Sequence, residues 1–317
     1  MNIPNEIKAR FVKDFDIPMQ VVKDPYFDYY VELFDSQFRT KAKLALLLDA
    51  LKQFGSPENF FKASKEFTEG IIEYIKAKQS YADFTQMDME RFKAKVPMRK
   101  GELYQEDNAG HQFISFDLRQ ANFNSMRFVN PDIFDGHIGH NGFIDFARKF
   151  TNSDYLLSSK KLRQVIFGNL CPTRQQTVQK YLVSILYECL LNSGFGEGDE
   201  GDIKTSNSDE IVLLCDTTLE AALDFIFKIK NLLIFDACKL FSTEIFKLRR
   251  LGTDKYDFFV KENLETDALE IKGVPCAYMP EVVKFLKFGV MYEQELTDAD
   301  RLFYQDGRLC SFKEPLF

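Results

Sequence analysis

The sequence contains no tryptophan, only three histidines, and six cysteines scattered over 317 residues without a C-x-x-C pair. Scattered cysteines argue against a disulfide framework or a zinc ribbon and predict buried, reduced thiols. Three histidines are too few for most nucleophile-and-base arrangements, and His137 and His140 have the wrong spacing for two helical zinc ligands. A metal ion, if one is bound, must therefore be held by oxygen atoms.

Long apolar runs are also missing. No run of eighteen apolar residues exists, and the first residues lack a basic-then-apolar signal, so we expect neither membrane insertion nor secretion and an intracellular location. The formal net charge is -7, with 41 Lys and Arg against 48 Asp and Glu. This balance excludes a uniformly basic protein that coats nucleic acid, but it leaves room for a local basic channel.

The sequence also lacks the motifs of several enzyme classes. A nucleophile elbow is absent, and so are the phosphate-binding patterns G-x-x-x-x-G-K-[ST] and G-x-G-x-x-G before a helix. The nearest glycine cluster, residues 194–201, is acidic and would repel phosphate. Serine hydrolases, P-loop enzymes and dinucleotide-binding enzymes are therefore disfavoured.

The first hundred residues show the pattern of amphipathic helices. Apolar residues recur at three- and four-residue spacings between Phe27 and Arg91, and Ser56 is a suitable N-cap for a helix that begins at Pro57. A basic run, which includes Lys93 and Lys95, ends this region. It is either a solvated linker or a strap that contacts phosphates.

The rest of the chain alternates between strand and helix patterns. Residues 103–105 and the alternating segment 112–117, separated by a turn signal at 107–110, predict a β-hairpin. Further strands are expected near 211–214, 241–248, 257–261 and 269–271, with helices at 219–234 and 280–286. The glycine-rich stretch 194–202 is expected to be a flexible loop. Irregular interleaving predicts an α+β fold with a mostly antiparallel sheet.

Two acidic strand ends are the strongest candidates for chemistry. Asp117 ends one hydrophobic strand, and Asp209 with Glu210 begins another. If the two strands are neighbours, Asp117 and Asp209 can converge on Mg²⁺, which prefers a few carboxylates with phosphate oxygens and water. Two such ions are the arrangement for phosphoryl transfer. The alternative is that each acid merely caps a turn.

A cationic segment lies between these acids. Seven basic residues and one acid occur from Phe146 to Tyr187, among them Lys160, Arg163 and Arg174. Arg163 and Phe167 are four residues apart and share one helical face. The segment is suited to a triphosphate or a nucleic-acid backbone, although it could also be a solvated helical face.

These residues resemble the core motifs of family A DNA polymerases. Asp117-Leu118-Arg119-Gln120-Ala121-Asn122 looks like the first palm motif, Asp-Tyr-Ser-Gln-Ile-Glu. Arg163-Gln164-Val165-Ile166-Phe167-Gly168 is similar to the fingers-helix core Lys-x-x-x-Phe-Gly, and Ser208-Asp209-Glu210 is similar to the third motif, His-Asp-Glu. The order along the chain is that of the family. The resemblance covers roughly residues 110–215.

The resemblance implies a template-directed nucleotidyltransferase of DNA replication, a DNA-binding transferase that uses magnesium. The implied architecture is a thumb-like helical region at 1–100 and a palm at 101–317 with inserted fingers at about 131–193. Its implied partners are a primer-template and nucleoside triphosphates, with room for an accessory subunit, and no membrane.

The resemblance also implies roles for individual residues. Asp117 and Asp209 would ligate the metal, with Glu210 as a supporting acid. Arg163 would bind the triphosphate and Phe167 would stack on the base. Nucleotide contacts are also expected for Lys160, Gln120 and Asn122, the last in place of the family's Glu beside the sugar. Nucleic-acid contacts are expected for the residues Lys93, Lys95, Arg174, Gln175 and Gln176.

Two other classes of function stay open. One is a non-catalytic nucleic-acid-binding replication accessory protein, which would bind in a salt-sensitive manner and extend nothing. The other is an interaction protein whose phenylalanine-rich surface binds a partner.

Overall fold

A computed structural model describes residues 3–94, 96, 98, 100–137, 141–193, 203–207, 209–232, 240–252, 257–287, 297, 301–305 and 308–312. The chain divides into two compact units. The helical unit comprises Met1–Asp88 and Met126–Gln175, and the sheet unit comprises Met89–Ser125 and Gln176–Phe317. Among the predicted fingers residues, those up to Gln175 therefore group with the N-terminal helices, whereas the sequence placed the whole segment inside the palm.

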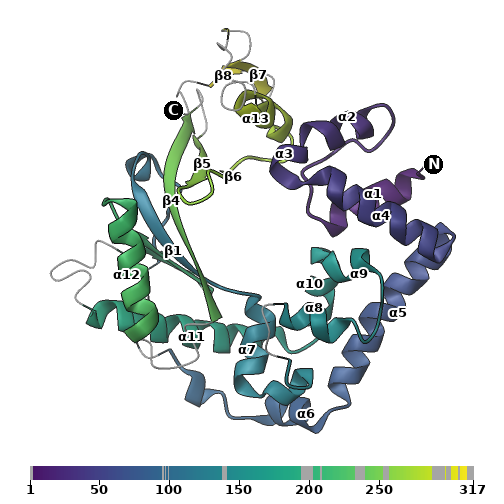
Figure 1. Ribbon diagram of the computed structural model, residues 1–317, viewed down its shortest axis with the longest axis vertical. Coiled ribbons are helices and arrows are strands. Elements are labelled where there is room, and N and C mark those ends of the chain that lie inside the picture. The colour runs from purple at the N-terminus through teal and green to yellow at the C-terminus, as the bar shows by residue number, and fades with distance from the viewer. Residues whose placement is uncertain are drawn as a thin grey trace. The chain divides into compact units, whose positions relative to one another are not determined.

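The helical unit is built from short and medium helices (Figure 1). Its helices are α1 (Asn5–Asp14), α2 (Tyr26–Leu33), α3 (Asp35–Phe38), α4 (Thr40–Phe54), α5 (Pro57–Lys76), α6 (Gln79–Gln86), the 3₁₀ helix η3 (Pro131–Phe134), α8 (Gly142–Ala147), α9 (Asp154–Ser158) and α10 (Lys160–Gly168). Ser56 caps α5, since its Oγ accepts the backbone N–H of Asn59 at 3.2 Å, as the sequence predicted. The division between the units falls within α7 (Ala121–Val129) and α11 (Pro172–Asn192).

The core of the helical unit is aromatic. The buried ring of Tyr155 contacts those of Phe15 and Phe60, each at a centroid distance of 5.2 Å. The Tyr155 hydroxyl donates to the buried carboxylate of Asp14 at 3.0 Å, and Arg10 pairs with the same carboxylate at 2.7 Å. A buried tyrosine therefore has its polar end satisfied.

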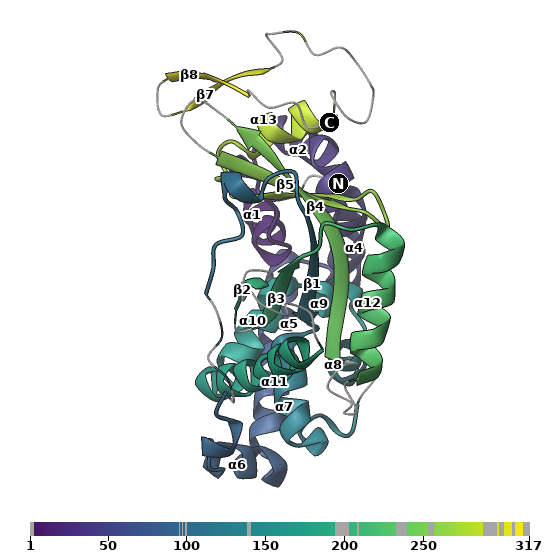
Figure 2. The same cartoon turned by 90° about the vertical axis from the view of Figure 1, so that its left-hand side faces the viewer.

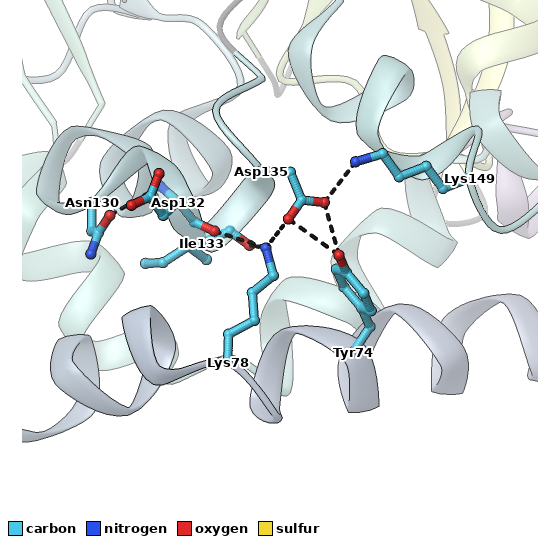
Figure 3. Close-up of polar contacts among 7 residues, drawn as sticks. All are labelled: Tyr74, Lys78, Asn130, Asp132, Ile133, Asp135 and Lys149. Carbon is cyan, nitrogen blue, oxygen red and sulfur yellow. Dashed lines mark hydrogen bonds and ion pairs between the residues drawn. The ribbon is translucent and has the colours of Figure 1, made fainter.

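A second polar network fixes the segment after η3 (Figure 3). The carboxylate of Asp135, a residue with a left-handed φ of 54°, accepts hydrogen bonds from Lys149 at 2.6 Å, from Tyr74 at 3.1 Å and from Lys78. Lys78 also donates to the carbonyls of Asp132 and Ile133 at 2.8 and 3.1 Å. One carboxylate thus ties the end of α5 to the chain around η3 and α8.

Replacing Asp135 with asparagine is expected to destabilise the protein at neutral pH by about 1 kcal/mol, since solvent screens part of the interaction at this exposed residue. Burial alone would raise the pKa of Asp135, but the bonds from Lys149, Lys78 and Tyr74 outweigh it and lower that pKa to about 2. The stabilisation is therefore present above the unfolded-state pKa of 3.8 and is lost as pH falls toward 2. Urea unfolding should show a difference at pH 7 that shrinks below pH ~4. An Asp132→Asn control should unfold like the wild type, and equal stability of all three proteins at pH 7 would contradict the prediction.

The sheet unit contains a six-stranded antiparallel sheet in the order β2-β3-β1-β4-β5-β6. Its strands are β1 (Gln112–Leu118), β2 (Ile203–Ser206), β3 (Glu210–Leu214), β4 (Phe241–Gly252), β5 (Asp257–Asn263) and β6 (Leu269–Lys272). A separate hairpin joins β7 (Leu302–Gln305) and β8 (Arg308–Ser311). The other elements are α12 (Leu219–Leu232), α13 (Met279–Leu286) and the 3₁₀ helices η1 (Glu90–Phe92) and η2 (Glu106–Asn108). The α+β class and the antiparallel sheet are confirmed.

The two faces of the sheet are covered differently. One face carries buried side chains such as Ile114, Phe116 and Ile245, and α12 packs along it beside β4 (Figure 2). Lys230 of α12 donates to Thr243 of β4 at 3.0 Å. The opposite face carries an apolar cluster of Leu103, Phe113, Val212, Phe246, Leu248 and Phe259.

The predicted hairpin of residues 103–105 with 112–117 is wrong. Both edges of β1 are already paired, with β3 on one side and β4 on the other. Residues 103–105 instead form a bend before η2, and Leu103 and Tyr104 pack over the apolar cluster. The backbone at Gly101 also packs closely against Lys204, because a Cβ atom added at Gly101 would lie 1.8 Å from the carbonyl oxygen of Lys204.

The expectations for the cysteines, for the loop 194–202 and for membrane-spanning helices have different outcomes. The cysteines that the structure describes are free, but only Cys215 and Cys310 are buried, while Cys276 is exposed. The predicted loop 194–202 lies outside the described residues. Within the described part of the chain, no helix has the length and apolar character needed to cross a membrane.

Candidate functional site

The two predicted acidic strand ends meet in the sheet unit. Asp117 of β1 lies directly opposite Glu210 of β3 in the antiparallel register. Asp209 precedes β3, and its carbonyl accepts the backbone N–H of Leu118 at 2.7 Å. The two strands are neighbours, which meets the condition that the sequence left open, and three carboxylates come from two neighbouring strand ends.

The register shows which side chains share a face with these acids. Directly opposed residues of antiparallel strands point to the same side of the sheet, and so do alternate residues of one strand. Ser115 and Asp117 therefore share a face with Glu210, with Glu244 of β4 and with Lys261 of β5. We call these five residues, together with Asp209, the acidic site.

Two of the acids are engaged by hydrogen bonds. Ser115, which is buried, donates from its Oγ to Glu210 Oε1 at 2.6 Å. Lys261 donates to Glu244 Oε2 at 2.8 Å, and Asn263 donates to Glu244 Oε1 at 3.2 Å. Both oxygens of Glu244 are consequently occupied.

The carboxylates of Asp117 and Asp209 differ from these. Neither makes a side-chain hydrogen bond or ion pair within the described residues. Burial, together with the nearby charges of Glu210 and Asp209, raises the pKa of Asp117 to about 6. Lys261 opposes this rise, and Glu244 adds to it. Two carboxylates without hydrogen-bond donors are thus held close to further negative charge.

Lys261 is the main positive charge of the acidic site. It is only 5% exposed, and its Nζ lies 4.3 Å from the ring centroid of Phe246 and 3.9 Å from Glu270. Tyr104, which covers this face, has its pKa raised by burial and by the charges of Glu210, Glu270 and Glu244. Its hydroxyl therefore stays protonated.

The donor set suits a hard cation that keeps part of its own water. Mg²⁺ is usually bound through one or two carboxylates plus substrate phosphates and water, and Asp117 and Asp209 offer two unengaged carboxylates. Among the residues that the structure describes, no group of three or more His, Cys, Asp or Glu side chains is arranged to hold a metal ion. These residues therefore fit a metal site in which substrate oxygens supply the remaining ligands.

In the sheet unit, a hydrogen bond orients Asn122. Its Oδ1 accepts a hydrogen bond from Nε2 of the buried Gln179 at 2.9 Å, and among the described residues the amide nitrogen of this exposed side chain has no partner. Gln120 is exposed and has a left-handed φ of 43°. Both residues belong to the sheet unit, as do the exposed Lys93 and Gln176. Lys95 and Ser208 lie outside the described residues.

The other predicted site residues belong to the helical unit, and two of them donate hydrogen bonds to backbone carbonyls at the ends of helices. Arg174 donates to the carbonyls of Phe84 and Met87 at 3.0 and 2.8 Å, which caps the end of α6. Gln175 is 1% exposed and donates to the carbonyls of Phe167 and Leu170 at 3.0 and 2.6 Å. Gln175 therefore caps the end of α10 and is not placed to touch a minor groove.

Phe167 lies in the core. It is 5% exposed, and its ring lies 5.0 Å from Phe143 and 6.3 Å from Phe134, between centroids. A ring packed in this way offers no open face to a nucleobase, so the structure does not support the predicted stacking role. The physical reason is that the apolar face of α10 is filled by Leu162, Ile166 and Phe167 together.

Arg163 is the exception on this helix. Its guanidinium is half-buried, and within the described residues it has no hydrogen bond, ion pair or aromatic contact. Burial lowers the pKa of Arg163, although the group remains charged. Lys160, one turn earlier, is exposed and pairs with Asp16 at 2.7 Å.

Sequence reasoning missed Glu244 and Lys261. Glu244 could have been noticed, because it interrupts the apolar alternation of the strand that begins at Phe241. An isolated lysine such as Lys261 in a strand gives no such signal, because most lysines face solvent.

Comparison with known proteins adds no relative. No protein-family model, no curated protein and no solved structure matches the chain.

Proposed function

We propose that the protein is a template-directed nucleotidyltransferase that adds nucleotides to a primer 3′-hydroxyl with Mg²⁺ at the acidic site. The single observation that supports this proposal most strongly is the pair of unengaged carboxylates, Asp117 and Asp209, at adjacent ends of β1 and β3. Their hydrogen-bonded neighbours are Glu210 on β3 and Glu244 on β4, the other strand that pairs with β1. In a site built only for stability, such acids would be expected to carry hydrogen bonds.

In the proposed reaction, Asp117 and Asp209 hold the metal and Glu210 contributes negative charge from the same face. Magnesium bound there would promote attack by the primer hydroxyl and neutralise charge on the leaving pyrophosphate. Arg163 would bind the triphosphate through its guanidinium, which has no protein partner among the described residues. The antiparallel sheet would serve as the palm, residues 131–193 as small fingers and the first hundred residues as a thumb.

Asn122 would lie beside the sugar of the incoming nucleotide. Gln179 donates to its amide oxygen, and its amide nitrogen, a donor, has no partner among the described residues. A donor can bond to a 2′-hydroxyl, so discrimination against ribonucleotides is expected to be loose. Asn122→Glu should tighten it.

Primer extension tests the proposed function. A labelled primer-template is incubated with Mg²⁺ and with the deoxynucleotide and ribonucleotide pools separately. Metal-dependent lengthening of the primer is the expected result. Salt-sensitive binding of the primer-template without extension would instead identify the non-catalytic accessory protein.

Replacing Arg163 with alanine is expected to raise the KM for nucleotide by roughly 10- to 100-fold. A guanidinium on a triphosphate makes a charge-assisted contact that alanine cannot replace. Affinity for primer-template should change little. Steady-state extension over a range of nucleotide concentrations measures the effect.

Arg148→Ala is the matched control, since Arg148 is an exposed arginine of the same unit that pairs with Asp154 at 2.9 Å. Its KM for nucleotide should equal that of the wild type. An unchanged KM in Arg163→Ala, together with lost primer-template binding, would place Arg163 on the template instead.

A further inference from the structure

A cluster of three cations lies in the helical unit, outside the residues of the acidic site, and it includes Lys160, for which the resemblance implies a nucleotide contact. Arg39, with a left-handed φ of 50°, directly precedes α4, and Lys43 follows one turn later on the same side of that helix. The helix α4 packs against α9, and Lys160 begins α10 two residues after α9 ends. Lys160 and Arg39 both lie close enough to Lys43 to act on its charge.

The cluster has little compensating negative charge. Lys43 is half-buried, its Nζ lies 5.6 Å from the ring centroid of Phe15, and no carboxylate pairs with it within the described residues. Burial and the charges of Lys160 and Arg39 lower the pKa of Lys43, and only Asp16 opposes them. Asp16 is itself paired with Lys160, with both side chains largely exposed, at 56% for Lys160 and 72% for Asp16. An exposed pair of this kind contributes little stability, so an anion could displace it.

The surroundings favour a polymer over a free nucleotide. Free polyphosphates are commonly held by backbone N–H groups of a glycine-rich loop, but no glycine occurs in residues 1–54, the segment that contains Arg39 and Lys43. Two tyrosines are instead exposed on the adjacent helix α2, Tyr26 at 56% and Tyr29 at 46%. The end of α2 is attached to the start of α4, because Thr40 Oγ1 donates to the carbonyl of Val31 at 2.5 Å. Cations with nearby exposed aromatic rings are typical of surfaces that bind single strands.

We propose that Arg39, Lys43 and Lys160 form a binding site for the phosphate backbone of a single-stranded nucleic acid. Lys160 then contacts the strand and not the incoming nucleotide. The site does not depend on catalysis, so it can exist whether or not the acidic site transfers nucleotides.

The test measures binding of a fluorescent single-stranded oligonucleotide to the full chain without divalent metal over a series of salt concentrations. The variant Arg39→Met/Lys43→Met/Lys160→Met should bind the oligonucleotide about tenfold or more weakly at low salt. The slope of the logarithm of its affinity against the logarithm of the salt concentration should be shallower by about 2, because each lost phosphate contact removes about 0.7 from that slope. The matched control is Lys52→Met/Lys62→Met/Lys65→Met, which removes the same charge from exposed lysines of the same unit. The affinity of this control for the oligonucleotide should fall less than threefold.

A variant of opposite sign separates a binding role from a structural one. Asp16→Asn removes the competing carboxylate and should tighten binding by roughly twofold to threefold. Circular dichroism checks that each variant is folded. Lys160→Met alone, a change at an exposed position, keeps the test valid if the triple variant does not fold.

Two results would overturn the proposal. One is an equal loss of affinity in the triple variant and its control, which would mean that only overall charge matters. The other is that inorganic triphosphate binds through these three cations while the oligonucleotide does not, which would make the cluster a site for free polyphosphate. Extension activity enters neither result, so failure here is distinct from failure of the proposed function.

Discussion

Replacing Asp117 with asparagine is expected to abolish primer extension and, at the same time, to stabilise the folded protein. Extension should fall by at least about a thousandfold, because each 1.4 kcal/mol of lost transition-state stabilisation costs a factor of ten and a lost metal ligand removes several. Asp209→Asn should cause a loss of similar size. Near-normal extension by either variant would contradict the assignment of the acidic site.

The stabilisation follows from the raised pKa of Asp117. Its folded-state pKa of about 6 exceeds the ordinary aspartate pKa of 3.8, so folding is penalised wherever the carboxylate is ionised. Asparagine removes that penalty. Because Asp117 remains partly accessible to solvent although its carboxyl group is crowded by neighbouring atoms, the gain is discounted to about 1 kcal/mol at pH 7.

The stability gained by Asp117→Asn is expected to depend on pH. Below pH ~4 the carboxyl is protonated in both the folded and unfolded states, so the variant should have no advantage. The advantage should grow between pH ~4 and 6 and stay constant above that range. Urea unfolding without divalent metal at pH 4, 5 and 7 measures it.

Asp216→Asn is the control. Asp216 follows β3 at the opposite end from Asp117, and its carboxylate accepts the backbone N–H of Gln112 at 2.8 Å. That variant should keep its extension activity and should not gain stability.

Most of the local structure could be predicted from the sequence. The apolar periodicity of residues 219–232 and the N-cap at Ser56 have local causes, and both elements form where expected. The short strand β2 and the hairpin β7–β8 were missed, because four-residue strands carry too little alternation to be distinguished from loops. The hairpin predicted for residues 103–105 failed because turn chemistry does not reveal that distant strands already occupy both edges of β1.

The candidate site was predictable in part. Two acids at strand ends gave Asp117 and Asp209, since their type and position are visible in the chain. The sequence cannot show burial, and burial is what distinguishes Arg163 from its neighbour Phe167 on α10. The role of Lys261 depends on Glu244, which lies on another strand, so only the sheet register brings the two together.

Replacing Lys261 with methionine is expected to destabilise the protein by about 2 to 3 kcal/mol, less than the usual cost of removing one partner from a fully buried ion pair because Glu244 is 31% exposed. Lys261 is almost fully buried, and its loss leaves Glu244 without its cation on a face that also carries Asp117 and Glu210. Urea unfolding at pH 7 measures the change. Lys272→Met is the control, because Lys272 pairs with Glu270 nearer the surface, where such a pair contributes about 1 kcal/mol or less.

A double variant shows whether the cost arises from the unpaired acid. Glu244→Gln removes the charge that Lys261 neutralises, so Lys261→Met/Glu244→Gln should recover a substantial part of the stability that Lys261→Met loses. The coupling between the two positions should be about 1 kcal/mol or more, since the residues are in direct contact. Simple addition of the two single effects would mean that Lys261 stabilises the sheet by packing its stem on Phe246, and not by balancing the charge of the acidic site.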